Sequence, residues 1–456
     1  MKALPPLLIP AETRSREFDA KLLLACVAAE RGFRAIVGSR IHMHLGIARL
    51  PRGIYLAKDV RRPSHRMFRI LRSLGHAIVA WDEEGLIFIT PALYHRRRVH
   101  AATLAMVETY LAWGRQSGEL IRTAPGYPGC PIELTGNPRI DLLRPELRAL
   151  FAPEADELRA RHGDFVLVNT NFGRLNHFNP ALSLTPSAAG EASRRNLEPD
   201  DPPLEVWRHR ETIMHAMEAM VPVLARALPD HRIVVRPHPS ENHERWRRAG
   251  EGLANVAVVH EGPIAPWLMA ARAVVHNGCT TGLEGRLLGR PVFAYRPDGH
   301  AGFDKDLPNR LSQEARSLDD LIAMLKVAVG NSRPVPLTPA QGALLGDYIV
   351  ALDGPLASDR IADALVAFAA RRPLAPPPLG DRLAARASAT ARALIKRLNA
   401  LRPGHKDSAD FRDQRFPGVD LATVEARIQR LGALLGRFQG LRARVLADNV
   451  FEVLAP

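Results

Sequence analysis

Cysteine is scarce in this sequence, and its cysteines lie far apart. Of 456 residues only three are cysteine, at Cys26, Cys130 and Cys279. They form no Cys-x-x-Cys pair and no Cys/His cluster with the spacing of zinc ligands. A disulfide-stapled secreted protein and a structural zinc protein are therefore both disfavoured, and a reducing compartment fits best.

Long hydrophobic runs are also missing. No window approaches the roughly 20 apolar residues that a membrane-spanning helix requires. The apolar run within residues 1–12, MKALPPLLIPAE, is too short and too broken by prolines for a secretory signal. We therefore expect a cytoplasmic protein.

Acidic residues are fewer than basic ones. The 62 Lys and Arg residues outnumber the 48 Asp and Glu residues, which gives a net charge of +14. An excess of positive charge favours anionic partners such as nucleic acid, an acidic membrane surface or phosphate-bearing substrates. The arginines are dispersed and no recognition motif is present, so nucleic acid is the least favoured partner. Solubility explains the charge equally well.

Strand-like and helix-like segments alternate over residues 1–150. Strand patterns at 33–38 and 76–82 each follow an amphipathic helical pattern that ends at a glycine, Gly32 or Gly75. Such alternation is typical of a parallel sheet with helices on both faces. We therefore expect an α/β, Rossmann-like domain here.

The alternation restarts after a short charged helix and indicates a second α/β domain over residues 151–370. Its strand-like segments are 165–172, 232–238, 255–260, 272–277 and 291–297. The Pro- and Ser-rich residues 176–207 are predicted to be a long loop. Two such domains suggest two Rossmann-like halves facing a cleft, where ligands bind beyond the carboxyl ends of the strands.

Residues 371–456 are predicted to form a proline linker, Leu374–Gly380, and a helical extension. Within the extension, Arg382–Lys406 is a basic helical stretch that also contains several leucines. One interpretation is that this stretch lies on an anionic membrane surface. The other is that it packs across the two domains and keeps its basic side in solvent.

Three strand ends carry groups that are suited to catalysis or anion binding, and the first is acidic. Asp82, Glu83 and Glu84 directly follow the strand pattern at 76–82. Neighbouring carboxylates repel one another, which can raise the pKa of one of them and supply a general base. The alternative is an acidic turn that Gly85 closes.

The second strand end reads RPHPS and places His238 between two prolines. The prolines restrict the backbone, so the imidazole is held in place and can bind or protonate a phosphate oxygen. Arg236 adds a guanidinium nearby. Ser240 is expected to cap a helix that starts at Glu241, whose free N–H groups favour anions. The alternative is a turn that only ends the strand.

The third strand end, HNGCTTGLE at residues 276–284, joins a strand to a helix. Small residues there let backbone amides approach a phosphate, and Thr280 and Thr281 add hydroxyl groups. A capped helix start is the alternative. Cys279 is expected to be a small buried residue, because no activating arrangement is visible around it.

Together these motifs resemble those of bacterial sialyltransferases with a GT-B fold, written D/E-D/E-G, HP and S/T-S/T. Some transferases of the keto-sugar Kdo share the pattern. The phrases REFDAKLLLA, WDEEGL, TGNPRIDLLRPEL, RPHPSE and NGCTTGLEG further resemble the bacterial surface carbohydrate biosynthesis protein family. The resemblance covers about residues 8–370, and FRDQRFPG at Phe411–Gly418 extends it.

The resemblance implies a GT-B-like α/β fold and an inverting transfer of a nonulosonic acid or Kdo from a CMP donor. The acceptor would be a surface glycan, or a lipid-linked or protein acceptor. The reaction is expected to need neither a cofactor nor a metal, because no strand-end Asp-x-Asp provides a magnesium site. Asp200-Asp201 lies in the proline-rich loop instead.

The resemblance also assigns roles to individual residues. Glu84 maps to the base that deprotonates the acceptor hydroxyl, and Glu83 is its rival because Asp82 makes the register ambiguous. His238 maps to the group that stabilises or protonates the departing phosphate. The residues expected at the nucleotide or its phosphate are Arg236, Pro239, Ser240, Gly278, Thr280, Thr281, Gly282 and Glu261.

A few further polar residues have a functional and a structural interpretation. Arg16 is a candidate substrate ligand or a partner in a salt bridge. Asn169 and Asn171 either face the cleft or cap local structure. Glu261 ends a strand where a base or ribose can bind, or it belongs to an ordinary loop. Arg139 lies in a segment that resembles a domain-crossing connection and is an uncertain ligand.

Competing functions remain open at this point. A UDP-sugar transferase or 2-epimerase, or a CDP-alditol phosphotransferase, would use the same fold. A non-catalytic glycan-assembly protein is the alternative of another class. It is disfavoured because all three motif positions keep chemically competent residues.

Overall fold

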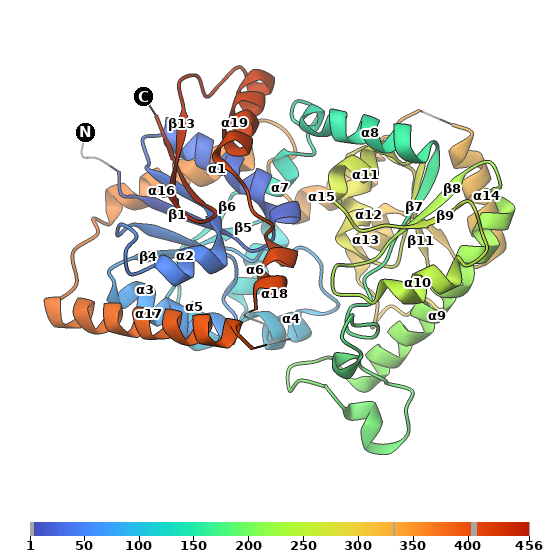
Figure 1. The fold of residues 1–456 in the computed structure, drawn as a ribbon, viewed down its shortest axis with the longest axis horizontal. Helices are drawn as coiled ribbons and strands as arrows, with labels where there is room; N and C mark the ends of the chain where they lie inside the picture. Colours follow the sequence, from blue (N-terminus) through green and yellow to red (C-terminus); the bar gives the residue numbers. More distant parts are fainter. Residues whose placement is uncertain (1–3, 332, 403–407, 456) are drawn as a thin grey trace. The chain divides into compact units, whose positions relative to one another are not determined.

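The computed structural model describes residues 4–331, 333–402 and 408–455 (Figure 1). The chain forms two compact units. Unit 1 comprises Met1–Leu86, Arg98–Leu150 and Leu344–Pro456, and unit 2 comprises Ile87–Arg97 and Phe151–Ala343. Each unit is built around its own sheet.

The sheet of unit 1 has the strand order β13-β14-β2-β1-β3-β4-β5-β6. The strands are β1 Leu7–Ala11, β2 Ala35–Ser39, β3 Ile54–Ala57, β4 Ala77–Ala80, β5 Thr109–Ala112, β6 Ile132–Leu134, β13 Arg442–Ala447 and β14 Val450–Leu454. Strands β1 to β6 are parallel. The order β2-β1-β3-β4-β5 is that of flavodoxin-like sheets. Their topological switch point, where the strand order reverses, lies between β1 and β3.

Helices of unit 1 follow from their apolar patterns. The helices before the tail are α1 Asp19–Glu30, α2 Arg40–Gly46, α3 His65–Ser73, α5 Ala101–Leu104, α6 Arg115–Arg122 and α7 Pro138–Asp141. In α3 the side chains of Met67, Phe68 and Leu71 are buried, as the predicted amphipathic face requires. Both predicted helix stops are confirmed, because Gly32 and Gly75 adopt positive φ angles that favour glycine.

Unit 2 has a six-stranded sheet with the order β12-β11-β10-β7-β8-β9, and every neighbouring pair is parallel. Its strands are β7 Phe165–Asn169, β8 Arg232–Arg236, β9 Val256–Val258, β10 Ala273–His276, β11 Val292–Tyr295 and β12 Gln313–Ala315. In chain order this is the 3-2-1-4-5-6 arrangement of Rossmann sheets, with the switch point between β7 and β10. The prediction of two Rossmann-like α/β halves is confirmed.

The helices of unit 2 complete these β-α-β connections. They are α4 Pro91–Arg98, most of which belongs to this unit, α8 Ala152–His162, α9 Leu204–Ala227, α10 His243–Ala249, α11 Ile264–Ala270, α12 Thr280–Leu287, α13 Asp306–Leu311 and α14 Leu318–Val329. The long α9 supplies Met217, Met220 and Leu224 to the buried core over β8.

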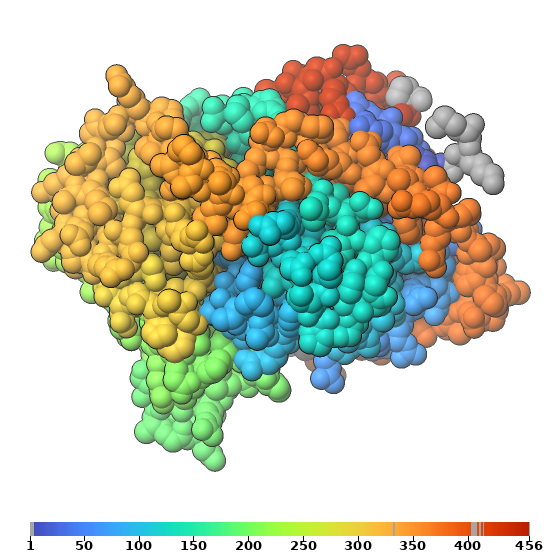
Figure 2. Space-filling view, turned by 180° about the vertical axis from the view of Figure 1, so that it is seen from behind, coloured from blue at the N-terminus to red at the C-terminus, as the bar shows by residue number. Residues whose placement is uncertain are grey.

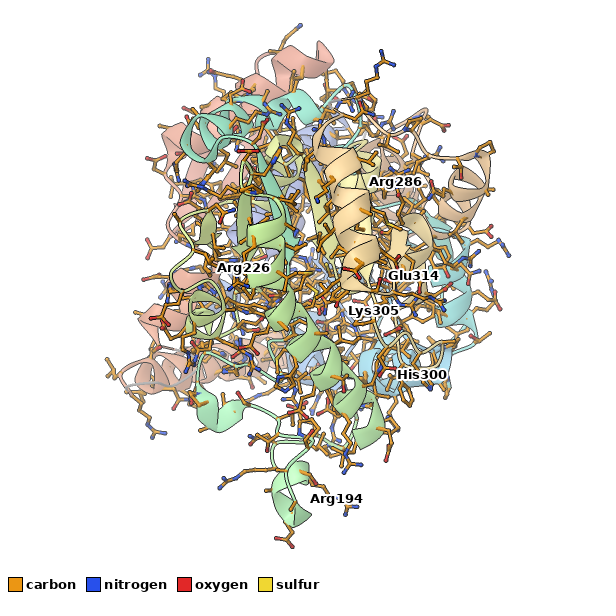
Figure 3. All side chains as sticks on the ribbon, turned by 90° about the vertical axis from the view of Figure 1, so that its right-hand side faces the viewer. Arg194, Arg226, Arg286, His300, Lys305 and Glu314 are labelled. Atoms are coloured by element: carbon orange, nitrogen blue, oxygen red, sulfur yellow. The ribbon has the colours of Figure 1, made fainter. Side chains whose placement is uncertain are left out.

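The predicted long loop lies between β7 and α9 and contains two short 3₁₀ turns, Pro180–Leu182 and Gly190–Arg194. It projects from unit 2, with Arg194 near its tip (Figures 2 and 3). Asp201 anchors its end, because the buried carboxylate contacts the guanidinium groups of Arg174 and Arg97. The loop ends earlier than predicted, since α9 already begins at Leu204.

The predicted all-helical extension is wrong near the end of the chain. Helices α15 Pro339–Tyr348, α16 Ala357–Arg371, α17 Leu379–Ala400, α18 Ala409–Arg415 and α19 Leu421–Leu435 are followed by the strands β13 and β14. Strand β14 pairs antiparallel with β2 and buries Phe451 and Val453, so alternating apolar residues outweigh helix propensity there.

The basic helix is present, but its bounds differ from the predicted Arg382–Lys406. It is α17, which begins at Leu379, ends at Ala400 and packs on α2 and α3. Residues 403–407 lie outside the described part of the chain. Within the described part, no helix combines the length and the apolar character needed to cross a membrane.

Candidate functional site

The carboxyl edge of the unit 2 sheet carries a hydrogen-bonded polar cluster at its switch point. Asn171 follows β7, and its side-chain oxygen accepts a hydrogen bond from the Asn277 amide, 2.9 Å away, after β10. The bond joins the two strands between which Rossmann sheets bind ligands. Asn169, at the end of β7, is buried, and its amide nitrogen has no hydrogen-bond partner among the described residues.

Arg210 brings a cation to the same place and was not predicted from the sequence. It extends from α9 and donates to the backbone oxygen of Asn171 at 2.9 Å and to its side-chain oxygen at 3.1 Å. The guanidinium also lies 5.6 Å from the centre of the Trp207 ring. Burial, reinforced by the charge of Arg97, lowers the pKa of Arg210. Nothing in the segment WRHRE marks Arg210, because the residues alone do not show which side of α9 faces inward.

Ser240, two residues further along the chain, fixes the side chain of His238. Its ring Nδ1 lies 2.8 Å from Ser240 Oγ and accepts a hydrogen bond from the Ser240 backbone N–H at 3.2 Å. A neutral ring whose Nδ1 accepts carries its proton on Nε2. The His238 side chain is exposed at the end of β8, so Nε2 is the nitrogen suited to donate to a ligand.

A buried carboxylate, Glu241, fixes the backbone around this histidine. Its Oε1 accepts from the backbone N–H groups of His238 and Phe172, both at 3.0 Å, and from the Thr170 hydroxyl at 2.8 Å. Its Oε2 accepts from the Trp246 indole at 2.9 Å. Burial raises the pKa of Glu241, although these hydrogen bonds oppose the rise. Glu241 therefore ties the end of β8 to the end of β7.

The predicted helix cap at Ser240 is wrong. Helix α10 begins at His243, and Asn242 caps it by accepting the Glu244 backbone N–H at 3.0 Å. The reason is that the Ser240 hydroxyl contacts His238 while the Glu241 side chain turns inward. Ser240 thus positions the imidazole directly.

Arg236 lies beneath this edge. It is buried and donates to the backbone oxygens of Gly262 at 2.7 Å and Glu261 at 3.3 Å, so its guanidinium holds the turn after β9. Burial lowers the pKa of Arg236 to about 10. The Glu261 side chain is exposed and pairs with Arg161. Contacts of Arg236 and Glu261 with a nucleotide stay predictions.

The start of α12 is shaped by a buried histidine. His276 Nδ1 accepts from the Gly278 backbone N–H at 2.9 Å, and its Nε2 lies 2.8 Å from Ser312 Oγ. A Cβ atom on Gly282 would lie 2.4 Å from His276 Nε2, so only glycine lets the helix approach this closely. Burial lowers the pKa of His276 to about 3.

The hydroxyl pair lies in the first turn of α12, where backbone N–H groups lack helical partners. Thr280 and Thr281 are half-buried, and Thr281 Oγ1 lies 2.5 Å from the Cys279 sulfur. Cys279 is buried as predicted, and burial raises the pKa of its thiol. Gly278 adopts a φ of 83°, which glycine accommodates without strain.

In unit 1 the three clustered acids after β4 lie in different surroundings. Asp82 is buried and contacts the Arg98 guanidinium, with Oδ2 2.9 Å from Arg98 Nε. Glu83 is also buried, and its Oε2 lies 3.4 Å from Lys21 Nζ. Only the side chain of Glu84 is substantially exposed, at 47%.

Glu84 contacts two arginines, with its oxygens 3.2 Å from Arg16 and 2.9 Å from Arg98. Burial raises the pKa of Glu84, but the charges of Arg16, Arg98 and Lys58 lower it further, and the net pKa is below its ordinary value. The expectation that clustered carboxylates raise this pKa is therefore wrong for Glu84. Arg16 forms a salt bridge, but its partner is not on its own helix.

Further charged residues gather beside the β1/β3 switch point, and of these Lys21 and Lys58 were not predicted. Lys21 on α1 is buried and donates to Glu17 at 2.7 Å. Lys58 after β3 contacts Glu12 after β1. Burial lowers the pKa of Lys58. Arg139 reaches the same region, with its Nη1 3.5 Å from the Glu83 backbone oxygen.

Among the residues that the structure describes, no group of three or more His, Cys, Asp or Glu side chains is arranged to hold a metal ion. Asp201 in the proline-rich loop is surrounded by arginines instead. The predicted site residues thus fall into two sets. The first belongs to the carboxyl edge of unit 2, and the second to that of unit 1.

No known family model matches the chain, and no curated protein matches it. Among solved structures, the UDP-GlcNAc 2-epimerase of Methanocaldococcus jannaschii in complex with UDP-GlcNAc and UDP is 12% identical, with a TM-score of 0.45, over 79% of this chain and 99% of that chain.

Two further solved structures are similar at the same level. The H548A form of the wall teichoic acid polymerase TagF is 11% identical, with a TM-score of 0.48, over 81% of this chain and 90% of that chain. Anabaena Alr3699/HepE in complex with UDP and glucose is 11% identical, with a TM-score of 0.42, over 80% of this chain and 100% of that chain.

Proposed function

We propose that the protein is a metal-independent, inverting glycosyltransferase. It moves a nonulosonic acid or Kdo-type sugar from a CMP donor to a surface glycan, or to a lipid-linked or protein acceptor. The observation that carries the proposal is the exposed His238 imidazole, which Ser240 and Glu241 fix at the carboxyl edge of a Rossmann sheet. The same edge bears the helix start with Thr280 and Thr281.

On the donor side, the chemistry required is the departure of a negatively charged CMP phosphate. A histidine with a proton on Nε2 can donate to that phosphate and stabilise its charge. The free N–H groups and hydroxyls at the start of α12 are suited to hold the phosphate oxygens. Arg210, at the switch point, adds a positive charge that sequence reasoning did not include.

On the acceptor side, the chemistry required is removal of a hydroxyl proton. Glu84 is assigned this role, because it is the exposed carboxylate of the three and its lowered pKa keeps it ionised at neutral pH. A low pKa also makes it a weak base, so the acceptor hydroxyl must displace part of its pairing with Arg16 and Arg98. Glu83 stays the rival base, although it is buried beside Lys21.

The donor class is tested by measuring the melting temperature of the full chain with CMP, CDP and UDP in turn. The proposal expects stabilisation by CMP above the other two, and slow hydrolysis of a CMP-sugar when acceptor is absent. Stabilisation by UDP alone would favour a UDP-sugar transferase or 2-epimerase. Stabilisation by CDP alone would favour a CDP-alditol phosphotransferase. Either result would overturn the CMP assignment.

The two catalytic roles are tested with His238→Ala and Glu84→Gln, with the exposed His215→Ala on α9 as a matched control. Loss of a general acid or base typically lowers the rate about 10²–10⁴-fold. Both variants should therefore lose transfer while the control keeps it. Unchanged transfer in both variants would remove these roles, whereas no transfer or CMP-sugar hydrolysis by the native chain would favour a non-catalytic protein. Loss in Glu83→Gln but not in Glu84→Gln would identify Glu83 as the base.

A further inference from the structure

Helix α17 carries a concentration of exposed apolar side chains. The large hydrophobic residues exposed on this helix or directly after it are Leu379, Leu383, Leu394, Ile395, Leu398 and Leu401, with exposed fractions from 51% to 79%. Elsewhere in the described part of unit 1, only Leu134 and Val445 are exposed to a comparable degree. Single exposed leucines are ordinary, but a group of them on one helix marks an interaction surface.

The exposed leucines lie on one side of α17. With 3.6 residues per turn, Leu383, Leu394 and Leu398 point within about 60° of one another. The opposite side is made of small residues spaced one turn apart, Ala385, Ala389 and Ala393, and these are buried against the neighbouring helices. The helix is therefore held to unit 1 by its alanine side and presents its leucine side outward. Figure 1 shows its full length along the edge of unit 1.

The charges on α17 are almost all positive. Its basic residues are Arg382, Arg386, Arg392, Lys396 and Arg397, and its acidic residue is Asp381. By the same spacing, the exposed Arg386 and Arg397 lie beside the leucine side, and a helix with an apolar side bordered by basic residues is suited to lie in the interface of an anionic bilayer. These basic side chains complement the phosphates of anionic lipids. An apolar soluble partner would offer no negative group for them to bind.

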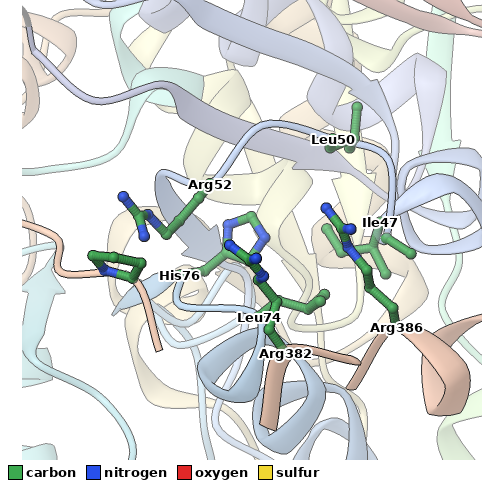
Figure 4. Close-up of a pocket in the computed structure, with 9 residues that line it drawn as sticks. Ile47, Leu50, Arg52, Leu74, His76, Arg382 and Arg386 are labelled. Atoms are coloured by element: carbon green, nitrogen blue, oxygen red, sulfur yellow. The ribbon is translucent and has the colours of Figure 1, made fainter. Parts of the chain in front are cut away.

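A pocket of about 410 Å³ adjoins the first half of α17 and contains no acidic side chain (Figure 4). Its polar lining consists of Arg52, Arg382, Arg386 and His76. The Nε atom of Arg382 is buried and has no hydrogen-bond partner among the described residues. Three guanidinium groups around one pocket are suited to bind a phosphate.

His76 completes the lining as a neutral donor. Its Nδ1 accepts from the Gly53 backbone N–H at 3.3 Å, which leaves the ring proton on Nε2. Burial and the charge of Arg52 lower the pKa of His76 to about 4. His76 and Gly53 precede β4 and β3, so the pocket is at the amino ends of the strands. It is therefore distinct from the acidic cluster at the carboxyl ends.

We propose that α17 docks the protein on an anionic lipid bilayer. The leucine side enters the acyl region, and the pocket of Arg52, Arg382 and Arg386 binds the phosphate of a lipid headgroup. The proposal rests on residues that the glycosyl transfer does not use. Its failure would therefore leave the proposed activity untouched.

The first experiment measures co-sedimentation of the full chain with vesicles. Vesicles of phosphatidylcholine alone are compared with vesicles that also contain phosphatidylglycerol. We expect binding only to the anionic vesicles and weaker binding as salt is raised, because the arginines act partly through screened charge. Equal binding to both vesicle types, or to neither, would overturn the proposal.

The second experiment separates the apolar and basic contributions. Leu394→Ser combined with Leu398→Ser should weaken vesicle binding at least tenfold, since two leucines no longer enter the acyl region. Arg52→Gln and Arg386→Gln should each weaken it about fivefold. Val327→Ser is the matched control, because Val327 is 74% exposed on a helix of unit 2. Equal effects of the control and the α17 variants would overturn the proposal.

Two further outcomes identify a different occupant. A dimer in light scattering that the double leucine variant dissociates, with no vesicle binding by either form, would assign the leucine side to a second copy of the chain. A rise in melting temperature with inorganic phosphate that Arg386→Gln abolishes, again without vesicle binding, would assign the pocket to a soluble phosphate. Both outcomes would overturn membrane docking.

Discussion

The carboxyl edges of the two sheets are both polar, but they are stabilised in different ways. In unit 1, charges of opposite sign are in contact. Lys21 contacts Glu17 and Glu83, and Glu84 contacts Arg98. In unit 2, the hydrogen-bonded groups are mostly neutral. The buried carboxylate of Glu241 accepts bonds from backbone, hydroxyl and indole groups rather than from a cation.

This difference matches two chemical tasks. In unit 1, the neighbouring arginines hold the pKa of Glu84 below its ordinary value, so that a proton acceptor is present at neutral pH. In unit 2, Arg210 donates its hydrogen bonds to the neutral oxygens of Asn171 rather than to a carboxylate. Added negative charge can then be stabilised without displacing a protein carboxylate.

The largest expected effect breaks the unit 1 arrangement. Lys21→Met removes a buried cation and leaves Glu17 and Glu83 as uncompensated buried carboxylates. Breaking a buried ion pair in this way costs about 3–5 kcal/mol of unfolding free energy. Thermal denaturation of the full chain should show an earlier transition. Lys326→Met, at an exposed position on α14, should change stability by less than about 0.5 kcal/mol. Similar melting temperatures of the two variants would contradict a stabilising role of the buried Lys21 ion pairs.

The next effect breaks the unit 2 arrangement. Glu241→Ala leaves the backbone N–H groups of His238 and Phe172 without their acceptor. An unsatisfied buried donor costs about 1–3 kcal/mol, so we expect a loss of about 3 kcal/mol in total. Hydrogen exchange at these two amides should accelerate. Glu244→Ala on the same segment, where the side chain is exposed, serves as the control. Unchanged exchange in Glu241→Ala would show that the carboxylate does not fix the loop.

Local sequence patterns predicted much of this fold. The helix stops at Gly32 and Gly75, the parallel strands and the long loop before α9 depend on nearby residues, and the structure contains all of them. Strand β14 was missed because its pairing partner, β2, is about 400 residues away in the chain. Short-range patterns cannot show such a contact.

The candidate site was predicted less completely than the fold. Motif residues such as His238 could be named as candidates because prolines and strand ends mark them in the sequence. Arg210 and Lys21 were missed, because each lies inside a helix and its inward direction depends on tertiary packing. Ser240 was assigned to the wrong task, since a serine before a helix resembles a cap unless its hydroxyl partner is known.

A smaller effect sharpens the role of the unit 2 helix start. Gly282→Ala would place a Cβ atom 2.4 Å from His276 Nε2 and push α12 away from β10. Overpacking of this kind costs about 1–3 kcal/mol. If the helix start holds a phosphate, affinity for CMP should fall together with stability. Isothermal calorimetry would measure the affinity, and thermal denaturation the stability. Gly346→Ala on α15, where a Cβ atom meets nothing within 4 Å, should leave both unchanged. Unaltered CMP affinity in a destabilised Gly282→Ala protein would exclude α12 from the nucleotide site.

The smallest effect tests the ion pairs of unit 1 through pH. The pKa of Glu84 is lower in the folded chain than in the unfolded one. Its ion pairs therefore stabilise the fold fully above the unfolded pKa of about 4.3, and this contribution is lost as the pH falls toward the folded pKa. Because Glu84 is half-exposed, the contribution is at most about 1 kcal/mol.

Arg16→Gln removes one of the charges that lower the pKa of Glu84, so that pKa should rise. The difference in melting temperature between the native chain and the variant should be largest near neutral pH and shrink below about pH 4.3. If Glu84 is the base, the acid limb of kcat/KM should move to higher pH in the variant. Arg115→Gln is the control, because it breaks an exposed pair with Asp347. The pKa of Glu84 in the variant can be measured by NMR titration. If that pKa has risen but the acid limb of kcat/KM stays in place, proton removal would be assigned to Glu83.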